Sequence, residues 1–460
     1  MRGGHVVTAH EEYDADVAVQ DGTIAAIGSG LRGTREIDAR GKLVIPGAID
    51  GHVHVRTLRD ADVYDDDWPD ATTAAAFGGV TTIVDQAQVE RGTTLTDGIT
   101  QRLDDAAGRS VVDYGIHVNL REANLERVAE FEALTSRGIP SFKVYMTYDD
   151  YMLPDELIFV VMQEAARLGG LVIVHAENHT MIGELQRQNA VAGRSGRHAN
   201  AAARPPEMEG EAVHRALAMA RLAGSRTLIY HVTAADSVRE IEAARQRGQV
   251  VYGEAVLHFL LLTADAMDDP VSGTAFDFSP PLRDEANQAA LWAGLARGGL
   301  DIVSTDHGPR RMIRHADGSA EAPPGTSGVE VRLPLIYTYG VRTGRISLNR
   351  WVDVCCTRPA EIFGLTRKGR ILPGYDADLV VFDPDRTVTL SHANLHSNID
   401  HSTYEGWTAR GFPVTTISRG RVLVHDGELL ADASDGHGRF IERGPGRPSL
   451  QPATPVSVRS

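Results

Sequence analysis

Alternation of apolar and polar positions marks both ends of the chain. Residues 1–46 follow a two-residue period, and the same period returns in 376–383 and 415–430, as expected for half-buried strands. Turn dipeptides separate these runs at Asp21-Gly22, Arg419-Gly420 and Asp426-Gly427. Neither end has enough strands for a stable sheet of its own. We therefore predict one small β-sandwich domain built from residues 1–46 and 372–430.

The pattern changes over residues 47–371, where short apolar runs rich in Val and Ile alternate with helical stretches. The predicted strands are 47–54, 80–86, 113–120, 141–146, 171–177, 227–233, 249–256 and 301–307. The predicted helices are 68–78, 95–108, 122–137, 154–169, 209–223, 234–247 and 284–298. Eight strands joined by crossover helices are typical of an α/β fold of the TIM-type, a (β/α)8 barrel. A doubly wound sheet is the alternative, because a strand count does not establish closure. The dinucleotide and P-loop glycine motifs do not follow the first strand, which argues against a nucleotide-binding fold.

Four segments fall outside this rhythm. The loop after the first strand, residues 57–67, carries five aspartates that we interpret as a solvated acidic face. Residues 192–208 are expected to form a long connection after the fifth strand, and 308–328 a loop rich in Gly and Pro after the eighth. Loops after barrel strands surround the active-site mouth, so these segments are expected to shape substrate choice. Residues 431–460 are expected to be a C-terminal tail that is mobile or lies on a partner.

Composition narrows the class of protein. The formal net charge of −16 argues against general nucleic-acid binding, because no basic surface is available for phosphates. No apolar stretch approaches the roughly 20 residues that span a bilayer, and the N-terminus lacks the features of a signal peptide. The only two cysteines, Cys355 and Cys356, are adjacent in a predicted helix, where neighbours rarely pair. We therefore expect a reduced, cytoplasmic setting.

Six potential metal ligands lie at the ends of predicted barrel strands. They are His52, His54, Lys143, His175, His231 and Asp306. Side chains two apart on a strand point to the same face, so His52 and His54 can reach one ion. Six nitrogen and oxygen donors in this strand order predict a two-metal site for hydrolysis.

Lys143 is the unusual member of this set. An ammonium has no lone pair and cannot ligate a cation. In a dry site its pKa falls, and the neutral amine can capture CO₂ to form a carbamate that bridges two ions. In isolation a lysine at a strand end would be read as a surface-reaching or ion-paired residue. The donors that surround it in strand order favour the metal-bridging interpretation.

Asp306 combines two roles in this prediction. Its carboxylate can bind a metal through one oxygen and accept a proton from water with the other. Two ions about 3.5–4 Å apart lower the pKa of that water toward neutrality. Imidazole and carboxylate ligands suit Zn²⁺, with Mn²⁺, Co²⁺ or Fe²⁺ as alternatives.

Together with their neighbours, these residues resemble the amidohydrolase superfamily, in particular its cyclic-amide branch of dihydropyrimidinases, hydantoinases, allantoinases and dihydroorotases. The segments that carry the resemblance span nearly the whole chain and include IDARGKLVIPGAIDGHVH, SFKVYMTYDDYMLPDELI, IVHAEN, YGEAVLHFLLLT, FSPPLRD and STDHGP. The resemblance implies two divalent ions, most simply zinc. One would be held by His52, His54, carboxylated Lys143 and Asp306, and the other by Lys143, His175 and His231. It also implies a bridging hydroxide, with Asp306 as proton shuttle, and a homo-oligomer, tetramer or dimer.

The same resemblance implies two substrate contacts. Tyr148, five residues after Lys143, matches a tyrosine that stabilises the developing oxyanion in hydantoinases, and Ser279 matches a residue whose backbone holds the ring amide. The alternative for Tyr148 is a packing residue at the barrel rim.

Three positions depart from the patterns of these relatives. Arg56 completes HxHxR, which resembles dihydroorotase, where this Arg grips a substrate carboxylate. The companion Asn of dihydroorotases is replaced here by Gln88, and Arg56 can equally neutralise the acidic loop. Where hydantoinases carry an Asn, this chain has Pro323-Pro324-Gly325-Thr326.

The leading hypothesis is a metal-dependent hydrolase that opens a hydantoin or dihydropyrimidine ring to an N-carbamoyl amino acid. The second hypothesis keeps the chemistry but changes the substrate to dihydroorotate, allantoin or another acidic or ureide ring. A third is a non-catalytic assembly protein. Such relatives lose metal ligands, and every expected ligand is present here.

Overall fold

A parallel barrel forms the centre of the molecule. The computed structural model describes residues 1–56, 65–122, 124–269, 273–314, 320–321, 323–430 and 435–446. Its eight barrel strands pair in chain order from β5 to β12. They are β5 (Ala48–Val53), β6 (Val80–Gln88), β7 (Asp113–Asn119), β8 (Ser141–Tyr145), β9 (Leu171–His175), β10 (Arg226–Ile229), β11 (Val251–Val256) and β12 (Ile302–Ser304).

The first and last strands meet, which closes the barrel. Val53 forms a parallel bridge with His307. The backbone N–H of His54 donates to the carbonyl of His307 at 2.6 Å, and that of His307 to the carbonyl of His52 at 3.3 Å. The prediction of a (β/α)8 barrel is confirmed, and the doubly wound alternative is excluded. All eight predicted strands are present, but β10 and β12 end earlier than predicted, because the chain turns sharply before His231 and Asp306.

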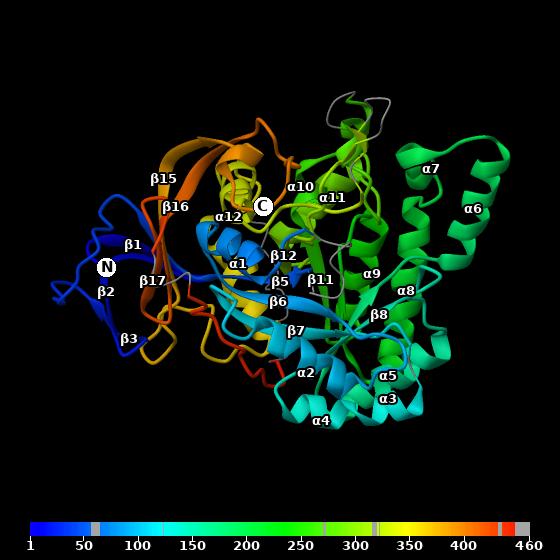
Figure 1. Cartoon of the computed structure of the whole chain (residues 1–460), viewed down its shortest axis with the longest axis horizontal. Helices are drawn as coiled ribbons and strands as arrows, with labels where there is room; N and C mark the ends of the chain where they lie inside the picture. Colours follow the sequence, from blue (N-terminus) through cyan, green and yellow to red (C-terminus); the bar gives the residue numbers. More distant parts are fainter. Residues whose placement is uncertain are drawn as a thin grey trace, which may run out of the picture.

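Helices pack around the barrel (Figure 1). The helices that lie in the predicted helical stretches are α1 (Trp68–Phe77), α2 (Leu95–Ala106), α3 (Leu125–Ala129), α4 (Phe131–Ser136), α5 (Asp155–Arg167), α8 (Pro206–Ala223), α9 (Ala235–Gln246) and α11 (Glu285–Arg297). The shorter ones include α10 (Leu257–Leu261), α12 (Arg332–Ile336), α13 (Leu348–Val352) and α14 (Arg358–Phe363). The single helix predicted over 122–137 is divided into α3 and α4 at Glu130, whose carboxylate accepts the backbone N–H groups of Leu95 and Thr96 at the start of α2.

The long connection predicted over 192–208 contains helices that the sequence analysis did not predict. This region contains α7 (Gly196–Ala202) and the start of α8, and it is preceded by α6 (His179–Val191). In Figure 1, α6 and α7 stand out at one side of the barrel. Only Ile182 and Asn189 of α6 are buried, and no residue of α7 is. Helices with so few buried positions have no apolar stripe, which is the signal that sequence reasoning depends on.

Strands from both ends of the chain form a second, mixed sheet, seen in Figure 1 where blue and orange strands lie side by side. Its order is β18-β17-β16-β15-β4-β1-β2-β3. The strands are β1 (Gly4–Val7), β2 (Glu12–Gln20), β3 (Thr23–Gly28), β4 (Leu43–Pro46), β15 (Leu379–Thr389), β16 (Thr408–Ser418), β17 (Arg421–His425) and β18 (Glu428–Leu429). Each of the three predicted turn dipeptides joins two antiparallel strands with positive φ at both residues, the geometry of tight hairpins.

The second sheet is tied to the barrel by buried charges. Lys368, only 3% exposed, donates to the carboxylates of Asp113 at the start of β7 and Asp378 next to β15. Arg419, in the β16–β17 turn, also donates to Asp113 at 3.0 Å. Removing one partner of such a buried set leaves an uncompensated charge, so this cluster holds the two parts in register.

The acidic loop and the tail differ from their predictions. Asp60 and Asp62 lie outside the described residues, but Asp66 is fully buried, so the solvated-face interpretation is wrong for it. Its carboxylate lies 3.0 Å from His307 Nε2 and accepts the backbone N–H of Asn398. Asp66 is buried there because His307, next to the barrel closure, provides a partner for its carboxylate.

Residues 435–446, predicted as part of a mobile or partner-bound tail, pack across the amino end of the barrel. The backbone N–H of Tyr114 donates to Arg439, and that of Arg443 donates to Gly138 at 3.0 Å. The Arg443 side chain is buried and contacts Ser141 Oγ at 2.8 Å. Residues 447–460 lie outside the described part. None of the described helices is long and apolar enough to cross a membrane.

Docking of the tail predicts a difference between two glycines of similar conformation. Gly364 and Gly374 both have positive φ, but a Cβ on Gly364 would lie 2.0 Å from the carbonyl oxygen of Gly444, whereas one on Gly374 would meet open space. Gly374→Ala is expected to lower the free energy of unfolding by about 1 kcal/mol through backbone strain. Gly364→Ala is expected to lose about 1–3 kcal/mol more, because the tail must move. Urea unfolding of both variants measures this, and equal losses would show that the tail contact is dispensable.

Candidate functional site

A cavity of about 660 Å³ opens at the carboxyl ends of the barrel strands. Within the described residues its lining includes all six predicted metal ligands, together with Tyr148, Ser279 and Gln88. These residues come from positions up to 254 apart in the chain. In a closed parallel barrel all strands end at one rim, so donors that are distant in sequence converge there.

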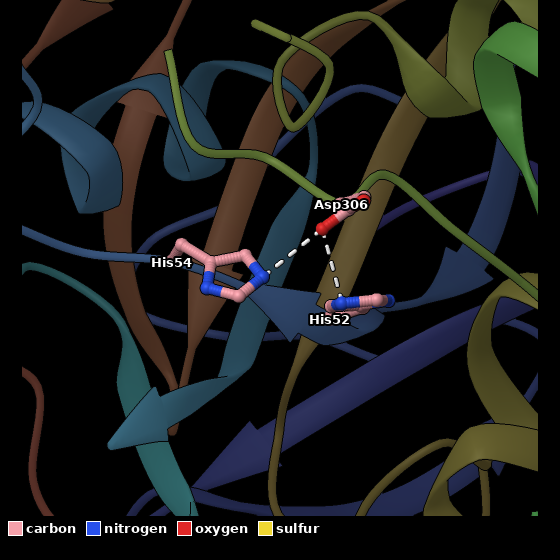
Figure 2. A group of neighbouring side chains, drawn as sticks. All are labelled: His52, His54 and Asp306. Carbon is pink, nitrogen blue, oxygen red and sulfur yellow. Dashed lines mark ion pairs between the residues drawn. The ribbon is translucent and has the colours of Figure 1, made fainter. Parts of the chain in front are cut away.

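His52, His54 and Asp306 form the tightest group. Asp306 Oδ1 lies 3.0 Å from Nε2 of each histidine. Figure 2 shows both imidazoles turned toward this one carboxylate, His52 and His54 from β5 and the segment directly after it, and Asp306 from the chain beyond β12. One ligand atom from each of the three lies within 4.8 Å of the others, a spacing that one metal ion could bridge.

Lys143 lies beside this group in a dry environment. Its side chain is 2% exposed, and its Nζ is 3.3 Å from His52 Nε2 and 4.9 Å from the ring centroids of Tyr145 and Tyr230. Burial lowers the pKa of Lys143 to about 8, although Asp306 opposes the shift. A neutral amine, the form that can react with CO₂, is therefore accessible near physiological pH.

His175 and His231 form the other half of the site. Their rings meet edge to face with centroids 4.3 Å apart. Burial holds the pKa of both imidazoles well below the usual range, so both are neutral at pH 7 and have lone pairs for a cation. Nε2 of His175 is 2.7 Å from Glu177 Oε2, which leaves its Nδ1 as the nitrogen for a ligand.

Two buried carboxylates support these histidines, and sequence reasoning gave neither a role. Glu254 Oε2 lies 3.0 Å from His52 Nδ1 and accepts the backbone N–H of His231 at 2.8 Å, so one carboxylate orients a residue from each half of the site. Glu177 contacts one candidate ligand, the His175 ring, through its Oε2. Both belong to segments that carry the family resemblance, IVHAEN and YGEAVLHF. For Glu177 the available signal was its place two residues after His175, whereas Glu254 has no candidate ligand near it in the sequence.

The carboxylates and imidazoles of the site shift each other's pKa values. Although burial opposes ionisation, the nearby His52 and His54 hold the pKa of Asp306 well below its usual range. Burial lowers the pKa of His52, but Asp306 and Glu254 outweigh this and raise it overall. The carboxylate is thus ionised and the cluster attracts positive charge, which a bound cation could supply in place of the His52 proton.

Tyr148 and Ser279 both line the cavity and lie within hydrogen-bond distance of each other. The Tyr148 hydroxyl donates to the Ser279 carbonyl at 3.2 Å. Burial raises the pKa of Tyr148, so the phenol stays protonated and can act as a hydrogen-bond donor. The pair offers one donor and one acceptor, the complement of an amide.

Unusual backbone conformations mark this site. Six non-glycine residues in the described part of the chain have a positive φ, and three of them are the first residues of the hairpin turns. The other three are Tyr148 (71°), His231 (37°) and Asp306 (51°). Left-handed backbone costs about 1–2 kcal/mol for such residues. Its concentration here indicates that the surrounding structure holds these side chains in place at the expense of stability.

The remaining predicted site residues have different placements. Gln88 lines the cavity, and the Tyr151 hydroxyl donates to its Oε1 at 3.1 Å. Pro324 lines it as well. Arg56 is not among the described lining residues, and its guanidinium lies 3.6 Å from the Asp67 carboxylate. This is the acidic-loop contact that the sequence left as one of two possibilities.

The donor set fits two divalent cations. The structure brings together four imidazoles, an ionised carboxylate and an amine of lowered pKa, and all six side chains line one cavity. Two of these imidazoles are oriented by buried carboxylates, His52 by Glu254 and His175 by Glu177. This combination of nitrogen and oxygen ligands suits zinc and related transition metals.

Comparisons with known proteins identify the family of the chain. The model of the amidohydrolase family matches residues 43–423. The D-hydantoinase of Ralstonia pickettii is 37% identical over 451 residues, covering 96% of this chain and 98% of that protein. Among solved structures, a D-hydantoinase from Bacillus sp. AR9 has a TM-score of 0.93 at 40% identity, covering 97% of this chain and 99% of its own. A dihydropyrimidinase from Brevibacillus agri NCHU1002 has a TM-score of 0.91 at 37% identity, with 97% and 98% covered.

The resemblance inferred from the strand-end ligands is thereby confirmed, and the chain belongs to the amidohydrolase family.

Proposed function

We propose that the protein is a metal-dependent cyclic amidohydrolase that opens a hydantoin or dihydropyrimidine ring to an N-carbamoyl amino acid. The observation that carries the proposal is the convergence of six potential ligands with the Tyr148–Ser279 pair in one cavity. The similarity to proteins named D-hydantoinase and dihydropyrimidinase, over nearly the full length of both chains, supports the same substrate class.

His52, His54, Lys143 and Asp306 would hold one zinc ion, and Lys143, His175 and His231 the other, with Lys143 carboxylated on Nζ. When bound, two such cations lower the pKa of a water molecule between them toward neutrality and so supply a nucleophile. The low pKa of Lys143 and the neutral state of His175 and His231 support this assignment.

The protein's own groups would perform the remaining steps. Asp306, ionised and facing the cavity, accepts the proton of the attacking water and passes it to the leaving ring nitrogen. Tyr148 donates its hydroxyl hydrogen to the carbonyl oxygen as negative charge develops there. The Ser279 carbonyl accepts the ring N–H. A bound ring amide would thus replace the Tyr148–Ser279 hydrogen bond with two of its own.

The acidic-ring alternative lacks its main support. Arg56, the residue that would grip a substrate carboxylate, is engaged by Asp67 and does not line the described cavity. Gln88 does line it, with its Oε1 accepting the Tyr151 hydroxyl, and we infer that its amide nitrogen serves a polar ring substituent. We therefore favour neutral hydantoins and dihydropyrimidines over dihydroorotate. We further infer a cytoplasmic location and a homo-oligomer, dimer or tetramer.

Lys143 provides the first test. Purified wild type is expected to contain close to two divalent ions per chain, and Lys143→Ala to lose both ions and activity, because no carbamate bridge can form. With ¹³C-bicarbonate, wild type should give a carbamate resonance that Lys143→Ala lacks. In metal-free protein this resonance should grow from about pH 7 to about pH 9, as the amine loses its proton. Lys42→Ala, which removes a lysine directly before β4 of the second sheet, is the matched control. Retention of metal and activity by Lys143→Ala would rule out the bridging role.

Asp306→Asn tests the proton shuttle. The amide cannot accept the proton, so kcat is expected to fall by about 10²–10⁴-fold, the usual contribution of general acid–base catalysis. Metal content is measured on the same samples to separate lost ligation from lost proton transfer. An unchanged kcat would remove Asp306 from the mechanism.

A substrate panel tests the ring class. Dihydrouracil and 5-substituted hydantoins are expected to be opened faster than dihydroorotate or allantoin in a spectrophotometric assay. Arg56→Ala should change kcat/KM by less than about threefold on every ring, since a partly exposed ion pair with Asp67 contributes little. A loss confined to carboxylated rings would instead support the acidic-ring alternative.

A further inference from the structure

Arg204 is a buried cation that lines the cavity and that the proposed mechanism does not use. The residue lies just after the end of α7 and is 5% exposed. Its Nη1 donates to Glu177 Oε2 at 2.8 Å, and the same oxygen lies 2.7 Å from His175 Nε2. One carboxylate oxygen therefore joins Arg204 to a candidate metal ligand.

The same guanidinium also contacts the candidate oxyanion donor. Its central carbon lies 5.5 Å from the centroid of the Tyr148 ring, within the range of a cation–π contact. The rings of Tyr148 and His175 meet edge to face at 4.9 Å. Arg204, Tyr148 and His175 thus form a closed triangle of contacts, with Glu177 on one side.

A third set of contacts fixes Arg204 from α7. Arg204 Nε donates to Asn200 Oδ1 at 3.0 Å. The Asn200 amide in turn donates to Asp277 at 2.8 Å and lies 3.4 Å from Ser279 Oγ. The helix that sequence reasoning missed therefore links Arg204 to the segment that carries the other substrate contact.

Burying a guanidinium is costly unless its charge is paired, and Glu177 pairs it here. Arg has a planar fork that can hydrogen-bond along its edge while its face stacks on a ring, which Lys cannot do. A cation near a phenol also favours negative charge on the phenol oxygen, so it strengthens that O–H as a donor. Because the three contacts use different parts of one side chain, Arg204 can hold Tyr148 and His175 in a fixed relation.

We propose that Arg204 is a positioning residue that sets the Tyr148 hydroxyl against the substrate carbonyl and, through Glu177, orients the His175 imidazole. The proposal rests on the proposed function for the role of Tyr148. The orientation of His175 does not depend on that role and can be tested without measuring enzyme activity.

The kinetic test is a double-mutant cycle with Tyr148. Arg204→Gln is expected to lower kcat on dihydrouracil or a hydantoin by about 10–100-fold, as for other groups behind a metal ligand, with a smaller change in KM. In a Tyr148→Phe background the same substitution should cost less than about threefold, because the group it acts through is gone. Arg204→Lys, which keeps the charge but not the fork, should rescue only part of kcat. Arg215→Gln, which removes a partly exposed arginine of α8 paired with Asp155, is the matched control.

The second test uses Co²⁺ in place of the native metal, with its visible absorption as the readout. Arg204→Gln and Glu177→Gln should both shift the intensity of the bands, because His175 is no longer held, while Arg215→Gln should match wild type. If wild type opens none of the rings but these spectra shift, the proposed function fails and the orientation of His175 by Arg204 stands. Additive kinetic losses together with unchanged spectra would overturn the proposal, as would unchanged spectra in a protein without ring-opening activity. Arg204→Lys serves both readouts if Arg204→Gln does not fold.

Discussion

Closure of the barrel is the constraint on which the site depends. The backbone bridge between Val53 and His307 joins the first strand to the last, and it places His52 and His54 opposite Asp306. Backbone hydrogen bonds of His52 and His54 with His307 hold this junction, so it does not rely on the side chains of the metal ligands. An open sheet would leave these donors on opposite edges, and no ligand set would form.

Removal of water from this rim then determines the chemistry of each group. Burial keeps His175 and His231 neutral and lowers the pKa of Lys143, the changes that turn these side chains into ligands. Burial alone would also protonate a carboxylate, yet Asp306 stays ionised because two histidines lie within 3.0 Å. The site is therefore an electrostatic unit in which each group's protonation depends on its neighbours.

Sequence patterns predicted the strands and helices that have many buried apolar positions. They missed the helices that have few. The barrel strands are continuous apolar runs, and the Asp-Gly and Arg-Gly turns have few alternative conformations. Helices α6 and α7 have almost no buried positions, so nothing in their sequence set them apart from a loop. Asp66 was misjudged for a related reason, since its buried partner, His307, is 241 residues away.

The order of strand-end donors, the tight hairpins and the chemical types of the ligands were determined by the sequence alone, because each is a local property of the chain. Tertiary structure decided which residues far apart in the chain come into contact. It brought Glu254 behind both His52 and His231, and it engaged Arg56 with Asp67 rather than with the cavity. Contacts between side chains far apart in the chain arise only when the barrel closes and buries them, and a single sequence has no local signal for them.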